Sequence, residues 1–117
     1  MPKSERTESM EQLANLKKSM SQMQEQMPEL IGKFQDFMGV CIADGALSCK
    51  EKEYIVLGAA VACHCPPCII MHVHKLLELG ATREEILEAA GVGVVMGGGP
   101  GFTNMQYVFM ALEDAGA

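Results

Sequence analysis

The chain is organised around residues 63–74, CHCPPCIIMHVH, which hold three of its five cysteines and all three of its histidines. Proline is best tolerated in the first turn of an α-helix, where its missing N–H would have no partner within the helix. Pro66 and Pro67 therefore predict a helix that begins here, with Cys65 at or beside its N-cap. The stretch therefore predicts where a helix begins and locates a cysteine at the N-terminal end of that helix.

Three reactive side chains of this helix are predicted to share one face. Because an α-helix advances about 100° per residue, Cys65, Cys68 and His72 fall within an arc of roughly 60°. His74 points to roughly the opposite side. A helix N-terminus favours thiolate over thiol, and an imidazole one turn after Cys68 can take up its proton. This face is suited to chemistry that begins with a thiolate.

Three interpretations of this face stay open at this point. In the first, Cys65 and Cys68 interconvert between dithiol and disulfide, which needs two nearby cysteines and an activating environment. In the second, they bind a metal together with His72. A closed zinc site needs four ligands, so Cys63 or Glu53 would have to complete it, and the sequence has no second Cys-x-x-Cys or histidine pair. In the third, the cysteines are buried and inert. We favour the redox interpretation and expect no metal and no cofactor.

The three remaining cysteines are expected to be structural. Cys63 ends an apolar helical segment, which favours a place in the core. Cys41 and Cys49 lie apart in the sequence, and we expect them to be buried thiols.

Downstream, the sequence marks two further helices. Gly80 is placed to end the preceding helix, because glycine readily adopts the left-handed conformation of the C′ position. Thr82 and Glu85 have the spacing of a capping box, which begins a new helix. These signals predict helices over about 83–97 and 101–114, separated by the glycine-rich segment 97–101.

Upstream, Ser48 and Glu51 have the same capping-box spacing and begin a helix that continues through the apolar run IVLGAAVA, residues 55–62. A helix this apolar on most faces is expected to be central and buried. Glu53 would then carry its carboxylate into the interior; the alternative is a solvated acid that interacts favourably with the helix dipole. His72 needs a partner that fixes its tautomer, and Glu53 is the nearest acid on a helix that must pack beside it.

Apolar side chains in the N-terminal third recur at alternating spacings of three and four: Leu13, Leu16, Met20, Met23, Met27, Leu30, Phe34 and Phe37. Such a seam packs against another helix, either within the chain or across a subunit interface, and we weigh the two equally. Pro28 interrupts it, which predicts helices over about 8–26 and 28–43. We divide the chain into an N-terminal amphipathic helix, residues 1–27, expected to make an oligomer contact, and a helical domain, residues 28–117.

Composition bounds the class of protein. A chain of 117 residues with 49 % hydrophobic and 21 % charged residues suits one globular domain, here all-α with about six helices. Its net charge of −6 disfavours a nucleic-acid partner. We find no apolar run long enough for a membrane span and no charged segment followed by an apolar one at the start. We therefore expect no membrane partner and a cytoplasmic location.

In its motifs the sequence resembles the carboxymuconolactone decarboxylase / alkyl hydroperoxide reductase D-like family. The signature of that family is a glutamate, eleven residues, Cys-x-x-Cys, three residues and a histidine, and Glu53, Cys65, Cys68 and His72 fit it. The resemblance covers about residues 44–101. The other matching segments are Asp44-Gly45-Ala46-Leu47-Ser48, Gly80-Ala81-Thr82-Arg83-Glu84-Glu85-Ile86 and Met96-Gly97-Gly98-Gly99-Pro100.

This resemblance implies an all-helical fold that assembles as trimers or hexamers. It also implies a thiol-disulfide oxidoreductase with peroxiredoxin activity or disulfide reductase activity. The substrate would be a small hydroperoxide or a disulfide, and the reductant a protein thiol of the thioredoxin-like or lipoyl type. In the peroxidase branch, the glutamate and histidine, here Glu53 and His72, relay protons to the second cysteine, here Cys68. The first cysteine, here Cys65, completes the disulfide, whereas the helix-terminus argument favours Cys65 as the more acidic thiol.

One position departs from the peroxidase type, which has a histidine immediately before the second cysteine. Pro67 stands there in this chain. The decarboxylase branch lacks the cysteine pair and acts on a lactone. The presence of Cys65 and Cys68 argues for redox chemistry over a lyase, with the metal-binding module as the other alternative.

Overall fold

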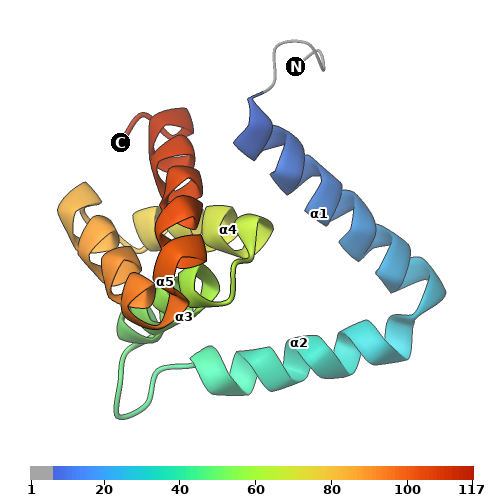
Figure 1. The fold of residues 1–117 in the computed structure, drawn as a ribbon. Coiled ribbons are helices and arrows are strands. Elements are labelled where there is room, and N and C mark those ends of the chain that lie inside the picture. The colour runs from blue at the N-terminus through green and yellow to red at the C-terminus, as the bar shows by residue number, and fades with distance from the viewer. Residues whose placement is uncertain (1–6) are drawn as a thin grey trace.

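A computed structural model of the chain describes residues 7–117, and those residues form α-helices with no strand. The all-α prediction is confirmed (Figure 1). The helices are α1 (Glu8–Gln26), α2 (Pro28–Ile42), α3 (Cys49–Ala62), α4 (Pro66–Glu78) and α5 (Arg83–Asp114).

Local signals in the sequence set most of the helix boundaries. The Ser48 side chain accepts from the N–H of Glu51, whose carboxylate accepts from the Ser48 N–H in return, so α3 begins with a complete capping box. Thr82 and Glu85 form the same reciprocal pair at the start of α5. Gly80 follows the C-cap of α4 with φ of +85°, the left-handed conformation expected of it. These predicted boundaries are confirmed.

The fifth element contains the two helices that the sequence predicts. Residues 83–114 form one element that is kinked at Gly98, whose φ of 61° and ψ of −147° are not helical. Helical geometry resumes at once, because Pro100 falls in the first turn after the kink, where its missing N–H costs little. The glycine-rich segment therefore ends one helix and leads directly into the next, and the two together carry the label α5. With the two halves of α5 counted separately, the described residues form the six helices that were expected.

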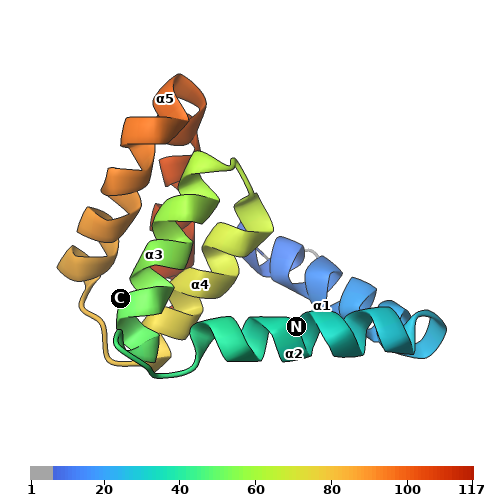
Figure 2. The same cartoon turned by 90° about the horizontal axis from the view of Figure 1, so that it is seen from below.

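The core forms where α3 packs against α4 and α5 (Figure 2). Its fully buried side chains are Leu57, Val61, Ile69, Ile70, Val73, Leu76, Ile86, Ala90, Val108, Ala111 and Leu112. Backbone contact between α3 and α5 is close, because a Cβ on Gly93 would overlap the carbonyl oxygen of Gly58. The prediction that α3 is buried on most faces is only partly right, since Ile55 is 60 % exposed.

Helices α1 and α2 form a V that extends from this core (Figure 1). The first turn of α1 is fastened to the end of α5, because Ser9 is buried and its hydroxyl donates to the Asp114 carboxylate. Leu13 packs against the core as well. The first six residues of the segment predicted over 1–27 lie outside the described residues.

Over residues 7–117, no helix combines the length and the apolar character needed to span a membrane.

Candidate active site

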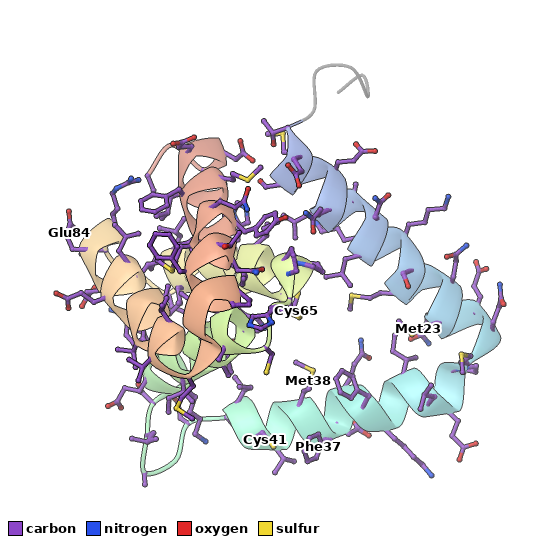
Figure 3. All side chains as sticks on the ribbon, in the orientation of Figure 1. Met23, Phe37, Met38, Cys41, Cys65 and Glu84 are labelled. Atoms are coloured by element: carbon purple, nitrogen blue, oxygen red, sulfur yellow. A yellow bond between two sulfur atoms is a disulfide. The ribbon has the colours of Figure 1, made fainter. Side chains whose placement is uncertain are left out.

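The two cysteines of the Cys-x-x-Cys motif are joined in a disulfide at the start of α4. Cys65 is the N-cap residue of that helix and Cys68 lies in its first turn, with 5.3 Å between their Cα atoms. Both residues are half-buried. Figure 3 shows Cys65 on the side of the helical body that faces α1 and α2, with Met38 of α2 on the same side. The distance between the two Cα atoms lies in the usual range for a disulfide, so the two cysteines can interconvert between dithiol and disulfide.

The turn that delivers Cys65 to this position is compact. Two hydrogen bonds close the end of α3: the His64 N–H donates to the Val61 carbonyl (3.2 Å) and the Cys65 N–H to the Ala60 carbonyl (3.1 Å). This is the bonding pattern of a Schellman motif, in which the C′ residue adopts left-handed backbone angles. His64 occupies that position with φ of 56°. The last turn of α3 thus leads directly into the first turn of α4.

The two prolines change the electrostatics of this helix start. A helix N-terminus stabilises an anion through its partial positive charge and its free N–H groups. Pro66 and Pro67 have no N–H, so only Cys68 has one among the first three residues of α4. Cys65 therefore gains less thiolate stabilisation from the helix terminus than an ordinary N-cap cysteine would gain.

A buried carboxylate–imidazole pair joins α3 to α4, and its imidazole lies one helical turn after Cys68. Glu53 Oε2 lies 2.6 Å from His72 Nδ1, and the two residues are 3 % and 8 % exposed. The packing of α3 against α4 brings them together, as the sequence predicted. A carboxylate accepts, so His72 donates from Nδ1 and its Nε2 is left to exchange a proton elsewhere. Because Cys68 precedes His72 by one turn, the imidazole is on the same helix face as that thiol.

The other cysteines and His74 take no part in the Cys65–Cys68 disulfide or the Glu53–His72 hydrogen bond. Cys63 is exposed, and so is Cys41; the prediction that they are buried is wrong. Cys63 lies at the C-cap of α3, beyond the last core position, Val61, and Cys41 lies on α2, much of whose surface is open. Cys49 is half-buried. His74 is half-buried on α4, outside the group.

One contact near the disulfide has no counterpart in the sequence analysis. His64 Nε2 lies 3.3 Å from the carbonyl oxygen of Gly97, in the residue before the kink of α5. The available signal was the position of His64, between the end of one helix and the prolines that begin the next. That position needs a left-handed residue, but it does not reveal what the side chain reaches.

An apolar groove lies between α3 and α5. Its volume is about 460 Å³, and its lining residues are Tyr54, Ile55, Gly58, Ala59, Ala62, Ala89, Val92, Gly93 and Met96. Burial raises the pKa of the Tyr54 phenol, and the nearby Glu85 carboxylate acts in the same direction. The groove thus holds a neutral phenol among aliphatic side chains.

Metal binding finds no matching arrangement in the part of the chain that the structure describes. No three or more of its His, Cys, Asp and Glu side chains are grouped so that they could hold an ion. In this state the sulfur atoms of Cys65 and Cys68 are bonded to each other.

A model of the carboxymuconolactone decarboxylase family matches residues 28–108, which is more than half of the chain. The chain belongs to the carboxymuconolactone decarboxylase family. The resemblance found from its motifs is thereby confirmed.

Several members of the carboxymuconolactone decarboxylase family and related chains are similar over most of their length. A family protein of Legionella pneumophila, solved in its apo form, is 37 % identical with a TM-score of 0.85, over 91 % of this chain and 95 % of that one. A family protein of Thermotoga maritima is 23 % identical with a TM-score of 0.78, over 88 % of both chains, and shows the shared fold. An uncharacterised protein of Cupriavidus necator is 32 % identical over 76 % of this chain and 79 % of its own length.

Proposed function

We propose that this protein is a thiol-disulfide oxidoreductase that cycles Cys65 and Cys68 between dithiol and disulfide. The observation that supports it most is the buried Glu53–His72 hydrogen bond, whose histidine follows Cys68 of the disulfide-bonded Cys-x-x-Cys pair by one helical turn. A buried carboxylate and imidazole are costly to desolvate, and a proton-transfer role gives a reason for placing them beside a thiol.

With a hydroperoxide as substrate, the cycle has two steps. The thiolate of one cysteine attacks the terminal oxygen of ROOH, the O–O bond breaks, and the alkoxide takes up a proton and leaves as ROH. The cysteine is now a sulfenic acid. The second thiol attacks that sulfur, the S–S bond forms, and hydroxide takes up the thiol proton and leaves as water. In this proposal His72 accepts the first proton and returns it, and Glu53 fixes the orientation of the imidazole.

With a disulfide as substrate, the same pair exchanges twice. One protein thiolate attacks a substrate sulfur and forms a mixed disulfide, and the second protein thiol resolves it, so the substrate leaves as two thiols. In either case a protein dithiol of the thioredoxin-like or lipoyl type restores the reduced pair and becomes a disulfide itself. An antioxidative role has been suggested for the Thermotoga maritima protein, and such a role would suit this cycle.

Within this cycle we assign the attacking thiolate to Cys68. His72 follows it by one turn, whereas Cys65 precedes two residues that have no N–H to stabilise an anion. Pro67 also removes the relay histidine of the peroxidase type. A disulfide substrate is therefore favoured over a hydroperoxide, because exchange proceeds without protonating an alkoxide leaving group.

Single-cysteine variants test this assignment. Pre-reduced Cys65→Ser protein should still react once with a hydroperoxide or a model disulfide such as an aromatic disulfide, giving a sulfenic acid or a stable mixed disulfide on Cys68. Cys68→Ser protein should react at least tenfold more slowly. A Cys68→Ser protein that reacts at the wild-type rate contradicts the proposal. Turnover of a carboxylated lactone that survives both substitutions would support a decarboxylase-like lyase instead.

We also propose a cytoplasmic homo-oligomer, a trimer or hexamer. Support comes from α2, whose outward apolar side chains are left exposed by the described residues 7–117: Leu30, Phe34, Phe37 and Val40 are 55 %, 57 %, 65 % and 80 % exposed. Such a row is long enough to pack as a helix face against a second copy. Leu30, Phe34 and Phe37 are the last members of the apolar seam that begins at Leu13, within the segment 1–27 for which the sequence predicts an oligomer contact.

Sedimentation of the wild-type protein and of a Phe34→Ser/Phe37→Ser variant tests the assembly. The wild type should sediment as a trimer or hexamer and the variant as smaller species. The matched control is Lys33→Ser, because Lys33 is an exposed side chain of the same helix that forms an ion pair with Glu29. A monomeric wild type contradicts the proposal.

A further inference from the structure

His64 adopts a backbone conformation that is unusual for its residue type. Of the non-glycine residues that the structure describes, it alone has a positive φ, at 56°. The Schellman motif at the end of α3 demands this conformation of its C′ residue, and glycine usually supplies it because it has no Cβ. An L-residue there is strained, and strain of this kind persists where the surrounding structure enforces it.

The side chain of His64 makes the contact that offsets this strain. Its Nε2 lies 3.3 Å from the carbonyl oxygen of Gly97, and because a carbonyl can only accept, the imidazole donates. Gly97 directly precedes the kink at Gly98. The two backbones are also close here, since a Cβ on Gly97 would lie 3.1 Å from the Cα of Ala62. The contact therefore fastens the turn before the disulfide to the bend of α5.

We propose that His64 is a positioning residue for the redox pair, which holds Cys65 against α4 in the geometry of the disulfide. The inference rests on the proposed function, because it concerns the same Cys65–Cys68 couple. His64 precedes Cys65 directly, and the bond from the Cys65 N–H to Ala60 belongs to the turn that the imidazole fastens. The side chain fixes where the backbone of Cys65 lies, although it takes no part in bond making.

Fixing Cys65 favours the oxidised state. A disulfide forms more readily when its two thiols are held near each other, because less conformational freedom remains to be lost. When the imidazole is removed, the turn is freer in the dithiol form, and the equilibrium shifts toward the two thiols. Since the hydrogen bond is solvent-exposed, the free energy lost with it should be at the low end of the usual range for hydrogen bonds in proteins.

The test is the equilibrium of the full chain with dithiothreitol: protein dithiol and oxidised dithiothreitol give protein disulfide and reduced dithiothreitol. Alkylation and mass spectrometry count the free thiols at Cys65 and Cys68 over a series of ratios. His64→Ala and His64→Gly should each lower the constant for disulfide formation about threefold, a rise of about 14 mV in reduction potential for a two-electron couple. His74→Ala is the matched control and should keep the wild-type constant.

Stability separates positioning from a merely structural effect. Glycine relieves the left-handed strain, so the oxidised His64→Gly protein should unfold at the same denaturant concentration as the wild type or at a higher one. A structural effect would lower this midpoint and the disulfide constant together. The inference is overturned if both His64 variants keep the wild-type constant, if His74→Ala shifts it equally, or if His64→Gly loses stability. A wild-type chain that forms no Cys65–Cys68 disulfide at any ratio overturns the proposed function as well.

Discussion

Replacement of Glu53 by glutamine removes the charge behind His72 while keeping the shape of the side chain. When His72 accepts a proton, an imidazolium forms 2.6 Å from the Glu53 carboxylate in a site where both residues are buried. A hydrogen bond to a charged group contributes about 1.5–3 kcal/mol, against about 0.5–1.5 kcal/mol for a neutral one. The difference of roughly 1.4 kcal/mol corresponds to about a tenfold change in rate.

We therefore expect Glu53→Gln to slow the oxidation of the pre-reduced protein about tenfold at neutral pH. Its free energy of unfolding should change by less than about 1 kcal/mol, because the amide still accepts from Nδ1. Glu53→Ala should slow oxidation further and lower the free energy of unfolding by about 3 kcal/mol, because it leaves the buried Nδ1–H unpaired beside a cavity.

Stopped-flow measurement of thiol loss with a hydroperoxide and with a model disulfide gives the rates, and urea unfolding of the same samples gives the stabilities. Glu78→Gln is the matched control, since Glu78 is an exposed acid at the end of α4. The reasoning is refuted if Glu53→Gln reacts as fast as the wild type with both oxidants, or if Glu78→Gln is slowed equally.

Two further predictions concern the scaffold. Gly93→Ala should lower the free energy of unfolding, measured in urea, by at least about 1–3 kcal/mol, because the added Cβ would overlap the Gly58 carbonyl. A Cβ on Gly91 meets nothing within 4 Å, so Gly91→Ala should raise the free energy of unfolding slightly through helix propensity. Equal effects of the two substitutions would contradict the packing of α3 on α5. The capping boxes hold the pKa values of Glu51 and Glu85 below the usual glutamate range through their hydrogen bonds to Ser48 and Thr82. Because these folded-state pKa values are depressed, the stabilisation is present above the unfolded value of about 4.3 and is lost as pH falls through the folded values. The urea concentration at the unfolding midpoint of the wild type should therefore decrease as the pH is lowered from about 4.5. A Glu51→Gln/Glu85→Gln variant whose midpoint decreases just as steeply would contradict the assignment of this pH dependence to the capping boxes.

Local signals made most of the fold predictable from the sequence. A capping box depends on residues three apart, so Ser48 with Glu51 and Thr82 with Glu85 could be recognised without any knowledge of the tertiary structure. The prolines at the start of α4 are equally local. The pairing of Glu53 with His72 was within reach because Glu53 is the nearest acid before the histidine in the sequence, on a helix that had to pack beside it, and Glu51 of the same helix belongs to the capping box.

Features that depend on neighbouring elements were beyond the sequence. Cys63 and Cys41 were expected to be buried, but their exposure depends on where α3 ends and on how little of the chain covers α2. A glycine-rich segment predicts a break in the helix, but only the structure shows that the break lies at Gly98 and that helical geometry resumes directly after it. The reach of His64 to Gly97 depends on the packing of α5 against the end of α3.

The most direct test of the redox account is a thiol count, with peptide mapping, before and after one equivalent of oxidant at neutral pH. The chain has five cysteines, so the fully reduced protein should show five thiols and the oxidised protein three. The account predicts that the two lost thiols are those of Cys65 and Cys68, joined in a disulfide within one chain. It is contradicted if all five thiols survive both a hydroperoxide and a model disulfide, or if the loss maps to Cys41, Cys49 or Cys63.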